Sequence, residues 1–141
     1  MSPTTQTPST PDEIRARIRS EHAQISAQLA RVEALTERVG DDYASSVITL
    51  REELDVLGAI LLRHLHYEEY QLSSLTDEGA TDEATEGMRR EHQLQREILD
   101  RVIRELDETA VGSKLVIGVR ELSRAIRDDM EYEERELLNR P

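Results

Sequence analysis

The stretch His64–Leu72 reads HLHYEEYQL, and sixty-five residues later the stretch Asp129–Leu137 reads DMEYEEREL. The Tyr-Glu-Glu core and the closing leucine recur in register, whereas the leading histidine has become aspartate. In a helix, a residue four positions before a glutamate lies on the same face one turn away. The repeat therefore predicts two similar helical units, each presenting a pair of polar side chains to one site.

Apolar stripes with helical spacing lead into both stretches. The stripe residues are Leu50, Leu54, Leu57 and Leu61 before the first stretch and Leu115, Val119, Leu122 and Ile126 before the second. Two further segments repeat with an offset of seventy residues, and the matched residues are Ile18, His22, Leu29 and Val32 with Met88, His92, Leu99 and Val102. Steps of three and four residues are typical of helices that pack along one seam.

Breaks rich in Gly, Asp and Thr divide the chain into four periodic segments, and no β alternation is present. The predicted helices cover residues 12–39, 45–74, 83–108 and 113–139. The sequence thus predicts an all-α fold, an antiparallel up-down-up-down four-helix bundle built from two αα-hairpins. Residues 1–11 are rich in Pro, Thr and Ser and are expected to form a flexible tail, so the bundle covers residues 12–141.

Composition excludes several classes of function. The formal net charge of −12 argues against nucleic acid and anionic membranes as partners. The chain has no cysteine, so disulfides and thiolate metal sites are excluded. It also shows no bilayer-length apolar run and no signal-peptide pattern, which predicts a cytoplasmic protein. The oligomeric state is not indicated by the sequence.

Polar residues interrupt all four stripes at one level, near one end of the predicted bundle. They are His22, His64, Glu68, His92, Asp129 and Glu133. A single buried histidine is usually a hydrogen-bonded core residue, but buried carboxylates are costly unless they are paired or bind a metal. No Lys or Arg occupies these seam positions. Imidazoles and carboxylates together are satisfied by a metal cation, or by two.

Neighbouring polar residues have simpler explanations. Tyr67 and Tyr132 are expected to pack at the edge of the seam, with hydrogen bonding or electron relay as alternatives. His66 is expected on the surface. Four further glutamates are expected either to hold a histidine or to face solvent, and they are Glu21, Glu69, Glu91 and Glu134.

The order of these residues along the chain is a lone His, then His-x-x-x-Glu, a lone His, then Asp-x-x-x-Glu. No histidine has a glutamate three residues before it, which excludes the Glu-x-x-His pattern of ferritin-like bundles. With the last histidine restored, the order resembles the hemerythrin-like family, or HHE cation-binding domain, over about residues 12–139. The resemblance implies two iron ions with an oxo or hydroxo bridge.

Carried over by position, the resemblance implies a role for each polar seam residue. His22 and His64 would bind one iron, and His92 would bind the other. Glu68 and Glu133 would bridge the two ions. Asp129 stands where the family has histidine, and its charge and hardness should favour ferric iron.

The residue patterns and the resemblance together leave three classes of function. The leading one, which the resemblance implies, is a non-haem di-iron protein that binds dioxygen or reacts with oxygen or peroxide species, as in oxidative stress. The second is an iron storage or sensing module without catalysis. The third is a metal-free helical interaction protein whose polar layer only fixes the helix register.

Overall fold

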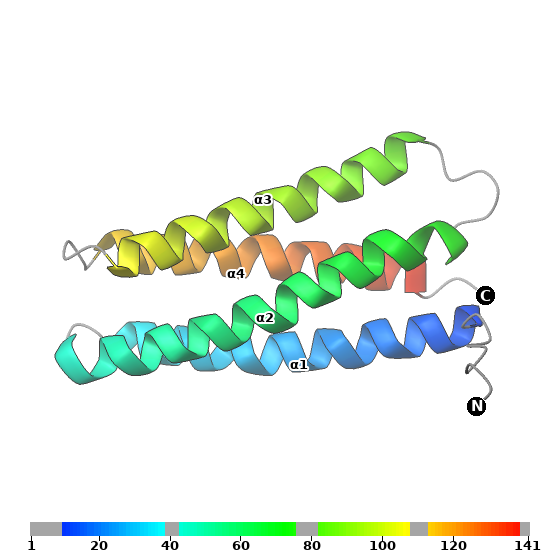
Figure 1. The fold of residues 1–141 in the computed structure, drawn as a ribbon. Coiled ribbons are helices and arrows are strands. Elements are labelled where there is room, and N and C mark those ends of the chain that lie inside the picture. The colour runs from blue at the N-terminus through cyan, green and yellow to red at the C-terminus, as the bar shows by residue number, and fades with distance from the viewer. Residues whose placement is uncertain (1–9, 39–42, 76–81, 108–112, 139–141) are drawn as a thin grey trace, which may run out of the picture.

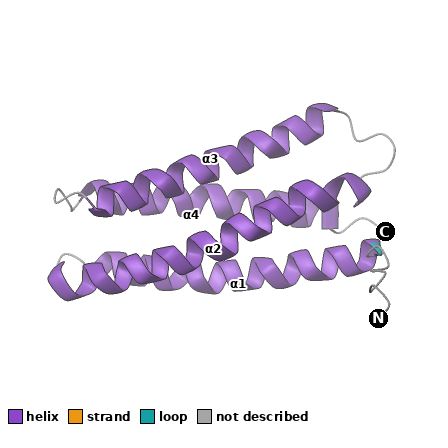
Figure 2. Ribbon diagram, in the orientation of Figure 1, coloured by secondary structure: helices purple, strands orange, loops and turns teal. Residues whose placement is uncertain are grey.

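The computed structural model describes residues 10–38, 43–75, 82–107 and 113–138 (Figure 1). Its helices are α1 (Pro11–Arg38), α2 (Tyr43–Leu75), α3 (Asp82–Asp107) and α4 (Ser113–Glu133), and α4 continues into a π-helical turn, η1 (Glu134–Leu138). Every described residue after Thr10 is helical, and these residues contain no strand (Figure 2). The predicted all-α fold is confirmed.

The four helices form a bundle in which successive helices run in opposite directions (Figure 1). Each helix packs against two others, α1 against α2 and α4, and α3 against α2 and α4. Two hairpins, α1–α2 and α3–α4, therefore lie side by side as predicted. Of the predicted tail, residues 1–9 lie outside the described residues, and Pro11 is the first residue of α1. No helix in the described ranges is long and apolar enough to cross a membrane.

A capping box starts α1. The Glu13 backbone N–H donates to Thr10 Oγ1 at 3.2 Å, and the Thr10 backbone N–H donates to Glu13 Oε1 at 3.3 Å. Two N–H groups that the helix cannot satisfy are thereby paired, and Pro11 follows where a missing N–H costs nothing. The start of α1 follows directly from these three residues.

The predicted apolar stripes form the core. Along α2 and α4 all eight stripe residues are at most 2% exposed. Burying such a leucine stabilises the fold by about 1.5–3 kcal/mol. At Gly118 an added Cβ would lie 3.0 Å from a Val102 methyl, so this glycine lets α4 approach α3 closely.

Two apolar clusters of unequal size lie along the bundle. The large one contains all the stripe leucines and reaches Leu65 and Met130. The small one consists of Ile14, Ile18 and Leu138, with Tyr67 and Met88 packed against it. On every helix the polar seam residues fall in sequence between, or at the border of, residues of the two clusters. The polar layer is therefore enclosed by apolar side chains on both sides.

Candidate metal centre

The structure brings the six polar seam residues together inside the bundle. His22 comes from α1, His64 and Glu68 from α2, His92 from α3, and Asp129 and Glu133 from α4. Their ligand-type atoms form two groups, and within each group the atoms lie within 4.8 Å of one another. Asp129 is the most exposed of the six at 8%, whereas Glu68 and His92 are fully buried. One site thus draws on all four helices.

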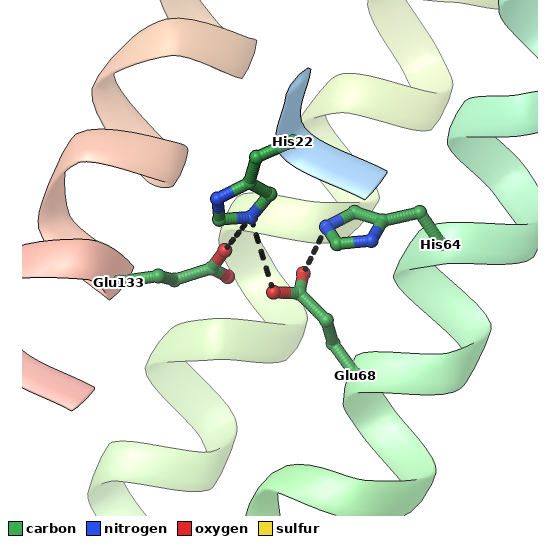
Figure 3. A group of neighbouring side chains, drawn as sticks. All are labelled: His22, His64, Glu68 and Glu133. Carbon is green, nitrogen blue, oxygen red and sulfur yellow. Dashed lines mark hydrogen bonds and ion pairs between the residues drawn. The ribbon is translucent and has the colours of Figure 1, made fainter. Parts of the chain in front are cut away.

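The first group contains His22, His64, Glu68 and Glu133 (Figure 3). His22 Nε2 lies 3.0 Å from Glu133 Oε1 and 3.6 Å from Glu68 Oε2, and His64 Nε2 lies 3.1 Å from Glu68 Oε1. The His22 and His64 rings meet edge to face, with centroids 4.8 Å apart. Atoms about 3 Å apart suit neighbouring positions around an ion that lies about 2 Å from each.

The second group contains Glu68, His92, Asp129 and Glu133. His92 Nε2 lies 3.3 Å from Asp129 Oδ2, and 3.4 Å from both Glu68 Oε1 and Glu133 Oε2. This group therefore has one imidazole and three carboxylates, whereas the first group has two of each. The second position is the more negatively charged of the two.

Glu68 and Glu133 belong to both groups. Glu133 directs Oε1 at His22 and Oε2 at His92, so each carboxylate oxygen faces a different group. Glu68 likewise contacts histidines of both groups. A carboxylate placed in this way can link two cations.

Outer carboxylates fix the orientation of all three imidazoles. The Nδ1 atoms of His64, His92 and His22 lie 2.7, 2.8 and 3.3 Å from oxygens of Glu21, Glu69 and Glu134, respectively. An ionised carboxylate can only accept, so each Nδ1 must carry the proton. Each Nε2 then faces the cluster, as metal-binding histidines require.

Two of these outer carboxylates are themselves held by arginine. Arg17 Nε donates to Glu21 at 2.9 Å, and Arg96 donates to Glu69 at 3.1 Å. Burial opposes ionisation of Glu21, but its bonds to His64 and Arg17 outweigh burial and lower the pKa of its carboxyl. Glu21 is thus kept ionised as an acceptor.

Without a metal, protons replace cations in the cluster. Burial opposes the charged form of His22, but contacts with Glu133 and Glu68 outweigh it and raise the pKa of His22 to about 10. The pKa of His92 rises to about 12 against the same burial penalty, because Asp129, Glu133 and Glu68 face it. The buried cluster therefore attracts positive charge strongly.

The pKa values of the two shared carboxyls, Glu68 and Glu133, are shifted in opposite directions. Burial disfavours the charged form of both. In Glu68 the contacts with three histidines prevail and hold its pKa well below the usual range. In Glu133 burial, together with the charge of Glu68, raises the pKa to about 8. Two carboxylates this close thus share the available positive charge unequally.

Several buried atoms of the cluster lack hydrogen bonds, and they test whether a metal fits. Within the described part of the chain, Glu68 Oε1 and Oε2 and His64 Nε2 have no hydrogen-bond partner, although His64 Nε2 lies 3.1 Å from Glu68 Oε1. Their relative orientation is therefore not that of donor and acceptor. Buried polar atoms without partners are costly. A cation between them would accept all three lone pairs, so the site fits a metal.

Gln95 is a buried site residue that the sequence reasoning missed. Its Nε2 donates to Asp129 Oδ2 at 2.8 Å, and its side chain is 1% exposed. Its position was a usable signal, because it lies one helical turn after His92 and interrupts an otherwise apolar face. The four glutamates divide as follows: Glu21, Glu69 and Glu134 hold histidines, while Glu91 is exposed.

The chain after Glu133 forms the π-helical turn η1. The predicted stripe places Leu137 four residues after Glu133, but the side chain of Leu137 lies outside the described residues. Leu138, five residues after Glu133, is buried in the small apolar cluster. π turns of this kind are frequent at functional sites.

The remaining neighbours lie at the edge of the site. Tyr67 is half-buried against the small apolar cluster, with the Arg17 guanidinium 3.7 Å from its ring centre. Tyr132 and His66 are exposed. The expected packing of Tyr67 and the surface position of His66 are thus confirmed, whereas the expected packing of Tyr132 is wrong, because its side chain is 51% exposed.

Comparison with known proteins gives one finding. The family model described as the hemerythrin HHE cation binding domain matches residues 13–140. No match was found among curated proteins or among solved structures. The matched range covers the four helices except the first two residues of α1, and it includes all six polar seam residues. The family match and the buried His/Glu/Asp cluster together indicate a metal-binding site.

Proposed function

Because the chain belongs to the hemerythrin HHE cation-binding domain family, we propose that it is a non-haem di-iron protein that binds dioxygen or reacts with dioxygen or peroxide. The observation that carries the proposal is the pair of ligand groups that share Glu68 and Glu133. In this assignment His22 and His64 bind one ion, and His92 and Asp129 bind the other.

The bound ions would supply the redox chemistry toward oxygen species. The chain's own residues bind, orient and insulate them. Glu21, Glu69 and Glu134 keep the proton on Nδ1 of each histidine, so that each Nε2 offers a lone pair inward. The two apolar clusters exclude water, which strengthens the electrostatic interactions within the site.

The two metal positions are chemically unequal in this proposal. Asp129 replaces a neutral imidazole with a hard anionic ligand, so the position beside His92 should favour ferric iron over ferrous. Asp129 is also the most exposed of the six residues. Both features support oxygen or peroxide reacting at that position rather than at the one held by two histidines.

An iron storage or sensing role without catalysis is the second candidate. It is favoured by the burial of the other five residues, none of which is more than 3% exposed. A closed site of this kind would hold iron but respond slowly to small molecules.

Metal analysis and an absorption spectrum of protein grown on iron test both candidates. We expect two irons per chain and near-ultraviolet absorption typical of coupled ferric ions, with changes on adding azide or peroxide. Zinc-loaded protein is the spectroscopically silent control. Two irons without any response to azide or peroxide would favour storage, and protein without iron would contradict the proposal.

A further inference from the structure

Gln95 is a buried polar residue beside the cluster that marks the second hairpin as different from the first. Seventy residues earlier, the matched position on α1 is Ile25, which is buried in the large apolar cluster. On the second helix of each hairpin, Asp129 of α4 matches His64 of α2 at an offset of sixty-five residues. Both exchanges, isoleucine to glutamine and histidine to aspartate, therefore occur across the same α3–α4 contact.

The two exchanges are chemically complementary. His64 presents an N–H away from the cluster and meets an acceptor, Glu21, at 2.7 Å. Asp129 has no N–H to donate, and it meets a donor, the Gln95 amide, at 2.8 Å. An isoleucine at position 95 would leave a buried carboxylate oxygen without this hydrogen bond, which is costly.

The contact also restricts how Asp129 can turn. Its Oδ2 accepts from Gln95 and at the same time lies 3.3 Å from His92 Nε2. A short carboxylate that is free to rotate could withdraw from the cluster or chelate through both oxygens. The amide instead holds Oδ2 toward the position that Asp129 shares with His92.

We propose that Gln95 is a positioning residue that holds Asp129 as a one-oxygen ligand and thereby sets the affinity of the second metal position. The inference rests on the proposed function, because it concerns the same two-metal site. It assigns Gln95 a role that is selective for one of the two ions, which a general packing role would not be.

The test is a titration of metal-free protein with ferrous iron under anaerobic conditions, comparing the wild type with Gln95→Met. Methionine keeps the length of the side chain but has no N–H donor. We expect the affinity for the second equivalent to fall about tenfold or more, and the affinity for the first to stay unchanged. The matched control is Gln93→Met, because Gln93 lies on the same helix but is exposed.

A second comparison does not depend on Gln95→Met folding. Asp129→His alone buries an amide against an imidazole, whereas Asp129→His with Gln95→Ile reproduces the pair found in the first hairpin. We expect the double variant to bind the second ion more tightly than Asp129→His does. Equal affinities in these two variants would overturn the inference.

The outcomes separate the inference from the function on which it rests. A wild type that binds two ions, with Gln95→Met equal to it at both equivalents, overturns the role of Gln95 alone. An equal loss at both equivalents also overturns it, because that result indicates general destabilisation. A wild type that takes up no iron overturns the proposed function as well.

Discussion

The two hairpins of this bundle hold matched inward-facing residues through hydrogen bonds of opposite direction. In α1–α2 an imidazole, His64, points an N–H outward and is held by Glu21. In α3–α4 a carboxylate, Asp129, is held by an amide donor, Gln95. The partner of each inward-facing residue is thus matched to whether that residue donates or accepts. In this buried site, the change from imidazole to carboxylate is accompanied by a change on the helix opposite.

Contacts between the hairpins keep the symmetry that the contacts within them lose. Glu69 on α2 holds His92 on α3, and Glu134, which directly follows α4, holds His22 on α1. Glu134 is the counterpart of Glu69 in the other hairpin, and His22 is the counterpart of His92, so the two pairs are equivalent. The asymmetry is therefore concentrated at the α3–α4 contact and in the π-helical turn η1.

The largest effect should come from the residues that belong to both ligand groups. Glu68→Ala or Glu133→Ala removes a carboxylate common to both ligand groups, so we expect loss of most iron from both positions. Elemental analysis after iron loading measures this loss, with Tyr67→Phe as the control that should keep its metal. Equal iron content in all three variants would exclude bridging by either glutamate.

The pH dependence should be nearly as large. Metal must displace protons from His22, His92 and Glu133, whose pKa values are about 10, 12 and 8 without metal. Each displaced proton contributes about tenfold per pH unit, so the combined affinity for the two ions should rise about a hundredfold or more per pH unit between pH 6 and 8. Iron-binding titrations in that range, with proton release followed by a pH indicator, measure the number of protons. Uptake without proton release would contradict this linkage.

The same pKa shifts have the opposite consequence for the metal-free protein. A raised pKa means that the folded state holds the proton more tightly than the unfolded state. The stability from His22 is therefore fully present below about pH 6.5 and is lost as pH rises toward 10. Melting temperatures of metal-free protein should fall from pH 6.5 to 9, whereas those of iron-loaded protein should fall less.

A smaller effect should distinguish Glu69 from Glu21, the outer carboxylates that hold one histidine of each metal position. Glu69 and Glu21 are matched, since each accepts from one histidine and one arginine. His92 is the only imidazole in its group, whereas His64 shares its group with His22. Glu69→Gln should therefore weaken one metal position about tenfold, and Glu21→Gln should have a smaller effect on the other. Affinities from stepwise iron titration make the comparison, and equal losses would remove this difference between the two metal positions.

Asp129→His should change reactivity more than metal content. A neutral imidazole removes the anionic ligand that favours ferric iron at the second position. We expect ferrous autoxidation and peroxide turnover to slow several-fold, measured by stopped-flow absorbance, while the helical circular dichroism stays unchanged. An unchanged rate and spectrum would place Asp129 outside the ligand set.

The bundle was predictable from the sequence because helical periodicity is a local property that repeats over many residues. The stripe through Leu54 and Leu61 continues into His64, so even the level at which the polar residues meet follows from the spacing. The pairing of Gln95 with Asp129 depends on side-chain directions across two helices, which spacing alone does not determine. The burial of Leu138 could not be predicted from the sequence either, because no local pattern predicts the π turn after Glu133.

The last prediction concerns Glu91, whose substitution should affect iron affinity only after Asp129 has been replaced by histidine. Glu91 matches Glu21 at an offset of seventy residues, but Glu91 is exposed, and Asp129 has no N–H to donate to it. In the wild type, Glu91→Gln should leave iron affinity unchanged. In Asp129→His the new imidazole would present an N–H, as His64 does to Glu21, and Glu91 is the acceptor placed to receive it.

Glu91→Gln should therefore weaken the second position in the Asp129→His background alone. Glu97→Gln on the same helix is the control, because Glu97 is exposed and bonds to Gln93 rather than to the cluster. A double-mutant cycle on the affinity for the second iron measures the coupling between positions 91 and 129. A coupling near zero would show that the second hairpin has lost the first hairpin's arrangement and that a histidine at position 129 finds its acceptor elsewhere. A clear coupling would show that the second hairpin can still form the histidine–glutamate pair of the first hairpin. Asp129 and Gln95 would then be a joint replacement of that arrangement.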